Sequence, residues 1–469
     1  MRKNTKFILV LSLVLLFSAL GSQAQNEWKW VRSDLNYEPV VIENDTLKNP
    51  PLEELSDSWW TVFGYEKLTE LENLALEGNF DILILENRVE EARQSVRIAK
   101  SSLFPALSLN PSYVRQELSA NRPLGFDVDL EPVRINSFTV PVDLNYEVDI
   151  LGKINNNVQA SKFDLKATEA RREDVTLAIT SDIARNFFNL VTIDTENIIL
   201  ENTLDTRQEN LDIVQARYDA GLVNQIDLQR AKTEYASVKV LLRNNQLLRT
   251  EIELALAILC GQEIQSFKVE DMELEFLPPV ITPKGQESLV SDRPDLQEIN
   301  FQLQAAEASL KVDKKELYPS FLLQGSFGYL SGESSEIFER DSRSWLIGGT
   351  VAVPIFEGFR RRANLDIAEQ RLEASKKIFN QQQLVANQEV ERSLSNILRL
   401  KEQLEAQQDF QFAAQQSAEL SKTRYLKGLV TYLEVVDSER IYLDAERLSV
   451  QLLGRQLVNT VSLIQAMGY

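Results

Sequence analysis

The sequence VPVDLNYEVDILG at residues 140–152 has a shorter counterpart, VPIFEG, at residues 353–358. In the first stretch apolar and polar residues alternate strictly, and a glycine ends the pattern. In the second, Val-Pro again leads to an acidic residue and a glycine, and its proline lies 213 residues after the first. Strict alternation predicts a β-strand, and a glycine at its end predicts a turn. The two stretches therefore indicate one strand design that is used twice.

Two further pairs of sequences recur in the same order. Residues 104–109 (FPALSL) resemble residues 318–323 (YPSFLL), with an offset of 214 residues. Residues 216–223 (ARYDAGLV) resemble residues 423–430 (TRYLKGLV), with an offset of 207 residues. Near-constant offsets of this kind indicate an internal repeat. We expect the chain to consist of two halves with one architecture.

Four segments have the alternation of strands, two in each half: residues 103–118, 137–151, 320–329 and 344–356. Strands of ten or more residues, apolar on one face and charged on the other, are typical of water-filled membrane barrels. A half-buried soluble sheet is the alternative, although its strands average only about 5–6 residues. Closed membrane barrels begin at about eight strands, and open edges are not tolerated in lipid. A barrel would therefore need several chains, each contributing four strands.

Two segments lack both proline and glycine and are rich in helix formers, namely residues 153–218 and 360–427. Each predicts a helix of roughly 100 Å at 1.5 Å per residue. Short breaks containing glycine follow at residues 219–224 and 426–431, and a further helical segment follows each break. Each half therefore predicts a helix, two strands and a long helical hairpin.

The N-terminus has the layout of a secretory signal peptide. Arg2, Lys3 and Lys6 precede an apolar run at residues 7–20, and Ala24 ends a small-x-small cleavage site. An uncleaved anchor is the alternative, but the run is short for a spanning helix of about 20 residues. The expected division is a signal peptide (1–24), an extended segment (25–57), a first repeat (58–261), a linker (262–291) and a second repeat (292–469).

Composition excludes several classes of function. The 469 residues include no histidine and one cysteine, so a histidine base, an intrachain disulfide and a cysteine-based zinc cluster are all excluded. The net charge of −20 argues against nucleic acid as a partner. A secreted hydrolase with two carboxylates is conceivable, but no pair of acids is singled out. We expect no catalytic residue, cofactor or metal.

Six motifs, in this order along the duplicated scaffold, resemble the TolC/OprM family of outer-membrane efflux proteins. They are residues 58–64 (SWWTVFG), 146–153 (YEVDILGK), 217–223 (RYDAGLV), 291–296 (SDRPDL), 354–362 (PIFEGFRRR) and 424–430 (RYLKGLV). The match covers nearly the whole chain after the signal peptide.

The resemblance implies an α+β membrane protein that assembles as a homotrimer. Three chains would form a twelve-stranded β-barrel in the outer-membrane lipid, continued by a helical barrel in the periplasm. The implied function is the passive exit duct of a tripartite efflux or type I secretion system. Its partners would be a periplasmic adaptor protein and an inner-membrane pump. A cell-surface coiled-coil scaffold or adhesin is the alternative, although it leaves the paired long strands unexplained.

A candidate gate lies just after the second break. Leu433, Asp437 and Arg440 are spaced i, i+4 and i+7, which places them on one face of a helix. By resemblance they match the aperture gate of the OprM branch, where threefold symmetry would make each residue a ring. The alternative is an ordinary solvated face with an Asp437–Arg440 pair. In the first half, Asp227 and Arg230 have similar spacing and are candidate partners.

The two breaks are the candidate docking site. Glycine at a helix end permits a left-handed conformation, and apolar residues exposed at a turn suggest a partner. By resemblance, that partner is the hairpin tip of the adaptor protein. The alternative is a self-capping turn packed on the neighbouring hairpin. The residues concerned are Gly221, Leu222, Val223, Gly428, Leu429 and Val430.

Overall fold

The computed structural model, which describes residues 58–120, 131–281 and 293–469, is dominated by two helices of 67 residues each, α4 (Lys153–Asp219) and α8 (Arg360–Leu426). All described residues belong to one structural unit, residues 44–469. The segments expected to be a signal peptide and an extended N-terminus, residues 1–57, lie outside the described residues. The two long helices begin and end within one residue of their predicted limits.

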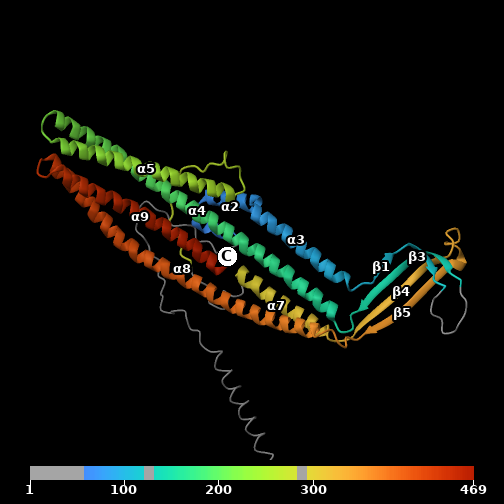
Figure 1. Ribbon diagram of the computed structural model, residues 1–469. Coiled ribbons are helices and arrows are strands. Elements are labelled where there is room, and N and C mark those ends of the chain that lie inside the picture. The colour runs from blue at the N-terminus through green and yellow to red at the C-terminus, as the bar shows by residue number, and fades with distance from the viewer. Residues whose placement is uncertain (1–57, 121–130, 282–292) are drawn as a thin grey trace, which may run out of the picture. The chain divides into compact units, whose positions relative to one another are not determined.

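Each long helix turns back into a second helix. α4 is followed by α5 (Gln225–Leu259), and α8 is followed by α9 (Tyr432–Met467). Helix α4 packs along α5, and α8 packs along α9. The two hairpins are joined through contacts between α4 and α9, and their turns lie side by side (Figure 1).

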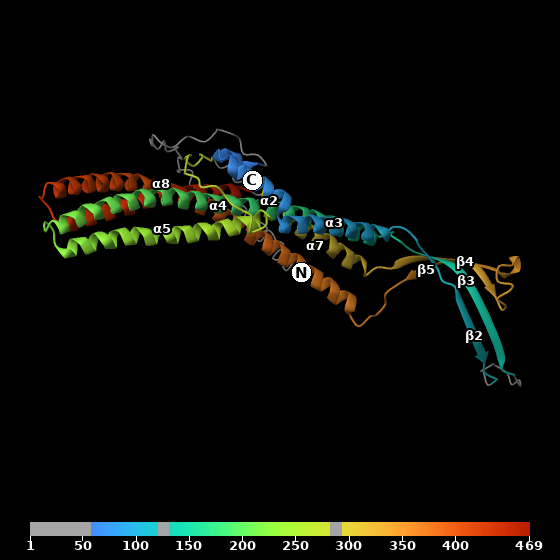
Figure 2. The ribbon, with the colours of Figure 1, turned by 90° about the horizontal axis from the view of Figure 1, so that it is seen from above.

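The strands form one antiparallel sheet with the order β1/β2, β3, β4, β5. Strands β1 (Ala106–Leu109) and β2 (Ser112–Leu118) both pair with β3 (Val133–Val148), and they keep the same register across the break at residues 110 and 111. They are therefore one strand line, interrupted where Pro111 has no N–H to donate. With β4 (Ser320–Ser331) and β5 (Arg343–Ala352), the chain supplies four strand lines, as predicted (Figures 1 and 2).

Two strands end earlier than the alternation predicts. β3 ends at Val148 because the next residue, Asp149, leaves the sheet to cap α4. The Asp149 carboxylate accepts hydrogen bonds from the N–H groups of Ile154 at 3.0 Å and Asn155 at 2.8 Å. β5 ends at Ala352, since Pro354 lacks an N–H and so cannot donate to a ladder.

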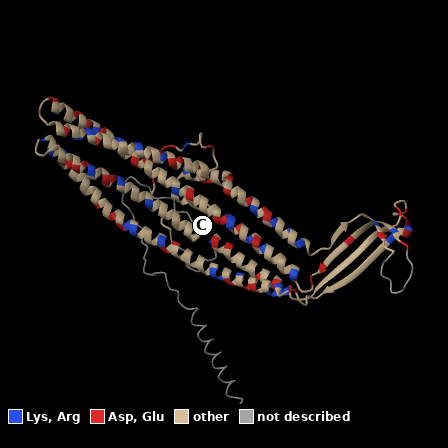
Figure 3. Cartoon of the chain, in the orientation of Figure 1, with Lys and Arg blue, Asp and Glu red and all other residues tan. Residues whose placement is uncertain are grey.

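The two outer strands of the sheet are unpaired within the described part of the chain. β1/β2 forms one edge and β5 the other, and every residue of β5 is exposed. The exposed side chains of β5 include Trp345, Ile347 and Val351. Charged residues of both signs run along the helices, whereas the strands carry few (Figure 3). A sheet with two open edges and a large exposed apolar surface is incomplete as a single chain.

The main core lies where the shorter helices meet α4 and the end of α9. Helix α7 (Pro294–Lys315) of the second half lies apart from this core: it packs on α4 and α8 and forms a small cluster with α8. The shorter helices of the main core are a 3-10 helix (Trp59–Phe63), α2 (Glu66–Gly78) and the start of α3 (Phe80–Ser101). Phe187 and Phe188 of α4 are fully buried there against Phe63 and Tyr65. The cysteine, Cys260, is buried in the same cluster, and burial raises the pKa of its thiol to about 12.

None of the helices within the described residues has both the length and the apolar character needed to cross a membrane.

Candidate functional site at the hairpin tips

Both hairpins end in the same hydrogen-bonded turn. Gly221 and Gly428 have φ values of +74° and +70°, the left-handed conformation predicted for them. In the first turn, the N–H of Gly221 donates to the carbonyl of Tyr218 and that of Leu222 to the carbonyl of Arg217, at 2.9 and 2.8 Å. The second turn repeats both bonds. This is the Schellman arrangement, in which two otherwise unpaired helix carbonyls are satisfied.

Of the leucine and the valine at each turn, only the leucine is fully exposed. Leu222 is 75% exposed and Leu429 is 66% exposed. Val223 and Val430 are half-buried and pack on one apolar cluster shared by the two hairpins. The prediction of two exposed apolar residues at each tip was therefore half wrong, because each valine is used to pack one hairpin on the other.

The cluster beneath the tips is built from the equivalent motifs of the two halves. Tyr425 and Tyr432 have ring centroids 5.4 Å apart, and the Arg217 guanidinium lies 4.9 Å from the centroid of Tyr425. Val214 and Val435 are buried beside them. Burial, together with the nearby Glu439 carboxylate, raises the pKa of Tyr432 to about 12, so this hydroxyl stays protonated.

The three candidate gate residues are exposed on α9. Leu433 is 40% exposed, and Asp437 and Arg440 are also exposed. Among the described residues, Asp437 forms no ion pair, although its charge acts on the Arg440 guanidinium. The solvated face of the alternative is therefore present, but without the pair. Arg440 instead forms a two-point ion pair with Glu234 of α5, with its Nε 3.0 Å from Oε2.

A groove of about 440 Å³ separates α5 from α9 at this level. Leu433 and Arg440 line one side of it, and Arg230 and Glu234 line the other. Arg230 donates to Asp227 on its own helix at 3.4 Å. The structure thus brings Leu433, Arg440 and Arg230 to one groove, whereas Asp437 and Asp227 lie outside its lining.

Buried ion pairs that the sequence did not single out hold the two hairpins together. Arg207 of α4 pairs with Glu439 of α9, and Asn210 donates to the same carboxylate at 3.2 Å. Closer to the core, Arg447 of α9 lies 3.2 Å from Glu196 of α4. The members of each pair are more than 200 residues apart in sequence, and no local pattern links them.

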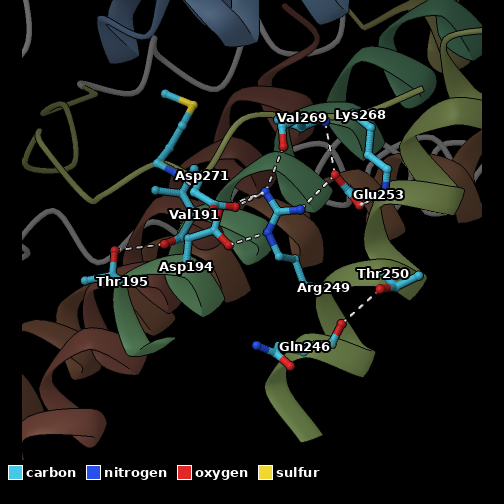
Figure 4. Close-up of polar contacts among 11 residues, drawn as sticks. Val191, Asp194, Thr195, Gln246, Arg249, Thr250, Glu253, Lys268, Val269 and Asp271 are labelled. Atoms are coloured by element: carbon cyan, nitrogen blue, oxygen red, sulfur yellow. Dashed lines mark hydrogen bonds and ion pairs between the residues drawn. The ribbon is translucent and has the colours of Figure 1, made fainter. Parts of the chain in front are cut away.

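The segment after α5, residues 262–281, is bound to the first hairpin through Arg249 (Figure 4). Arg249 pairs with Asp194 of α4 at 2.6 Å, with Glu253 of its own helix at 2.7 Å and with Asp271 of the segment at 2.7 Å. It also donates to the carbonyl of Val269 at 2.8 Å. The segment predicted to be a linker is thus firmly attached along this part of its length.

Arg293, the arginine of the motif at residues 291–296, joins elements of the second half as Arg249 does in the first. Arg293 is buried and makes a two-point pair with Asp295 at 2.9 and 3.0 Å. It also pairs with Glu389 of α8 at 2.7 Å and donates to the carbonyl of Ala466, at the end of α9, at 2.8 Å. One side chain therefore joins three helices of the second half.

The described residues contain no group of three or more acidic, cysteine or histidine side chains placed to hold a metal ion. The described residues offer a groove between α5 and α9, exposed leucines at the tips and a sheet with open edges.

Comparison with known proteins identifies this architecture. The family model described as "Outer membrane efflux protein" matches residues 71–262 and 286–469. The chain belongs to the outer membrane efflux protein family. It is 29% identical over 412 residues to the pyoverdine export outer membrane protein OpmQ of Pseudomonas aeruginosa, covering 87% of this chain and 86% of OpmQ. It is 27% identical over 413 residues to the cation efflux system protein CusC of Escherichia coli, covering 87% of this chain and 88% of CusC.

The fold is also that of solved outer-membrane channels. The structure of the outer-membrane channel OprN superposes with a TM-score of 0.82 at 22% identity, covering 91% of this chain and 94% of OprN. These findings confirm the α+β fold, the outer-membrane location and the role as an efflux channel that the sequence predicted. They exclude the alternative of a coiled-coil adhesin without channel activity.

Proposed function

We propose that three copies of this outer membrane efflux protein form the exit duct of a tripartite efflux system. The observation that carries the proposal is the sheet with two open edges, β1/β2 and β5. Backbone groups at a sheet edge cannot stay unpaired in lipid, so each edge needs the opposite edge of another copy. Four strand lines from each of three chains give a twelve-stranded barrel, within the known range for closed membrane barrels.

An exposed apolar stripe on α5 supports assembly through the helices as well. Ile226, Val240, Leu247 and Leu254 are all exposed, and they are spaced by seven residues or twice seven. A seven-residue apolar repeat is the pattern that packs helices in coiled coils. No helix of the same chain covers this stripe among the described residues, so a helix of a second copy is its natural partner.

In such an assembly the α9 residues Leu433, Asp437 and Arg440 would each form a ring of three around the duct. An apolar ring narrows a pore by dewetting, and charged rings select ions or pair with one another. Arg230 would support the ring from the other side of the groove, with Asp227 as its ion-pair partner. We propose that these five residues form the periplasmic gate.

The tips are the proposed docking site for a periplasmic adaptor protein, which would connect the duct to an inner-membrane pump. Leu222 and Leu429 are exposed apolar residues at the ends of hairpins, where burial of an apolar surface by a partner would be favourable. Gly221 and Gly428 shape the turns that present them. Val223 and Val430 would act indirectly, by fixing the two tips relative to each other.

The proposal names a duct and no single cargo. OpmQ is named for export of pyoverdine and CusC for efflux of cations, so proteins of similar sequence serve different cargo. We propose that the chain transports passively and catalyses no reaction. We also propose that residues 1–24 direct export, that residues 58–261 and 292–469 are the two repeats, and that residues 262–291 join them.

Single-channel recording from the full chain in planar lipid bilayers tests the proposal. We expect discrete conductance steps from a species that migrates as a heat-resistant trimer in detergent. Folded trimer without conductance would contradict the duct, and conductance from a monomer would contradict the assembly. Co-purification with an adaptor protein encoded beside the gene tests the docking separately.

A further inference from the structure

The sheet has one apolar face and one polar face. Side chains that lie opposite each other on paired strands share a face. An apolar row therefore crosses all four strand lines, made by the paired residues Leu109, Val142, Phe327 and Trp345. The adjacent row, on the other face, is polar and includes Asp143 and Ser326. In the proposed barrel the apolar face is turned to the lipid.

The apolar face becomes basic at one end of the sheet. Helices α3, α4, α7 and α8 all join the sheet at the other end, which is the periplasmic end of the proposed duct (Figures 1 and 2). At the end away from the helices, Arg343 lies two positions from Trp345, and Arg115 lies two positions from Tyr113. Residues two apart on a strand share a face, so both arginines belong to the apolar face. They therefore lie at the outer rim, on the side of the lipid.

Aromatic residues separate the apolar rows from these arginines. The rings of Tyr113 and Phe138 stack with a centroid distance of 4.5 Å, and Tyr329 lies beside Arg343 on the neighbouring strand. In membrane proteins, tyrosine and tryptophan side chains collect at the level of the lipid headgroups. Arginines next to such an aromatic layer are therefore placed at the depth of the headgroups.

Both arginines lack an anion within the described part of the chain. Arg134, a third arginine on this face, pairs with Glu117 at 2.5 Å. Arg115 and Arg343 are exposed, and neither forms an ion pair with any described residue, including the carboxylates of the loop between β4 and β5. Arg115 lies on the edge line β1/β2, and Arg343 lies on the edge strand β5. Because closure of the barrel joins these two edges, each seam between copies would contain both cations.

We propose that Arg115 and Arg343 bind phosphate groups of lipopolysaccharide, the phosphorylated glycolipid of the outer leaflet, at the seam between two copies. The inference rests on the proposed function, since it needs a closed barrel in the outer membrane. A guanidinium presents parallel N–H donors that match two oxygens of one phosphate. Its apolar stem lies along an apolar surface while the charge reaches the headgroup. A lipid bound at the seam would bridge two copies and stabilise the trimer.

The test is a titration of the purified full-length trimer in detergent with lipopolysaccharide. The measured quantity is the temperature at which the trimer dissociates into monomers on a gel. We expect lipopolysaccharide to raise this temperature, and lipopolysaccharide stripped of its phosphates to leave it unchanged. An arginine at an anionic membrane surface contributes roughly fivefold in affinity. Arg115→Gln and Arg343→Gln should each raise the lipid concentration for half of the protection by about fivefold, and the double variant by about 25-fold.

The matched control is the double variant Arg88→Gln/Arg97→Gln, which removes two exposed arginines from α3, outside the sheet. It should need the wild-type concentration of lipid. Equal protection by the dephosphorylated lipid, or a wild-type response of the Arg115→Gln/Arg343→Gln trimer, would overturn the inference.

A third result would also overturn it: a variant trimer that is weaker without lipid but is protected at the wild-type concentration. The arginines would then pair with the neighbouring copy instead of a lipid. If a variant fails to assemble, the comparison of the two lipids on the wild-type trimer decides alone. A wild-type chain that forms no trimer would instead overturn the proposed duct.

Discussion

The guanidinium of Arg217 lies 4.9 Å from the ring centroid of Tyr425, so that the arginine of one repeated Arg-Tyr motif stacks on the tyrosine of the other. The equivalent arginine of the second motif, Arg424, is exposed. Two copies of one motif are thus used differently, and the contact joins the two hairpins just below their tips.

Replacement of Arg217 by glutamine should loosen the two tips. A cation over an aromatic ring contributes about 0.5–2 kcal/mol, so the local opening of the tips should become several times more frequent. Hydrogen exchange of the amides in residues 214–221 and 425–432 measures this. Arg424→Gln is the matched control and should leave both segments protected as in the wild type. Equal loosening in the two variants would show that the stacked contact has no special role.

Arg249 should be essential for the attachment of residues 262–281. Its removal leaves Asp194 as a buried carboxylate without its cation, which typically costs about 3–5 kcal/mol, and leaves Glu253 with only the exposed Lys268. We expect Arg249→Gln to lower the Tm of the protein and to make this segment sensitive to limited proteolysis. Lys268→Gln removes an exposed cation 3.6 Å from the same Glu253. This control should change neither the Tm nor the sensitivity of the segment to proteolysis. A resistant segment in Arg249→Gln would mean that packing alone holds it.

Glu72 makes stability depend on pH. Both carboxylate oxygens are buried and have no hydrogen-bond partner in the part of the chain that the structure describes, and burial raises the pKa of the group from 4.5 to about 9. Between these values the unfolded chain releases a proton that the folded chain keeps, so stability is lost as pH rises from about 4.5 to about 9. Below pH 4.5 the group is neutral in both states and has no effect.

Glu72→Gln should therefore stabilise the protein at pH 7–8, by on the order of 3 kcal/mol, and should have little effect near pH 4.5. Thermal unfolding of the two proteins across this pH range measures the difference. Glu70→Gln, on the exposed side of the same helix, is the control and should show no such trend. A constant difference in Tm at all pH values would argue for a change in packing rather than in protonation.

Leu429→Asp should abolish export while leaving the trimer and its insertion in the membrane intact. Leu429 is 66% exposed at the second tip, so a carboxylate costs the isolated protein little but opposes burial against an adaptor. Cell survival under a known exported compound, with trimer levels checked in outer-membrane fractions, provides the measurement. Ile264→Asp, an exposed apolar residue of the segment after α5, should export normally. Normal export by Leu429→Asp would rule out docking through this residue.

The local architecture was predictable because it is encoded in short-range patterns. Alternation over residues 137–151 marked β3, and the absence of proline and glycine from residues 153–218 marked α4. The glycines of the two breaks were recognisable because a left-handed residue at a helix end favours glycine. The repeat itself then ordered these elements into two matching halves. None of these inferences depends on which side chains meet in space.

What only the tertiary structure decided is the partner of each side chain. Asp437 was a plausible partner for Arg440 one turn away, yet Arg440 pairs with Glu234, 206 residues distant. In the same way, Val223 and Val430 appeared equivalent to the leucines beside them but are used to pack the hairpins together. The rotation of each helix about its axis and the crossing of α4 with α9 select these contacts. Sequence periodicity determines which face of a helix is apolar, but not which residue of another helix lies opposite it.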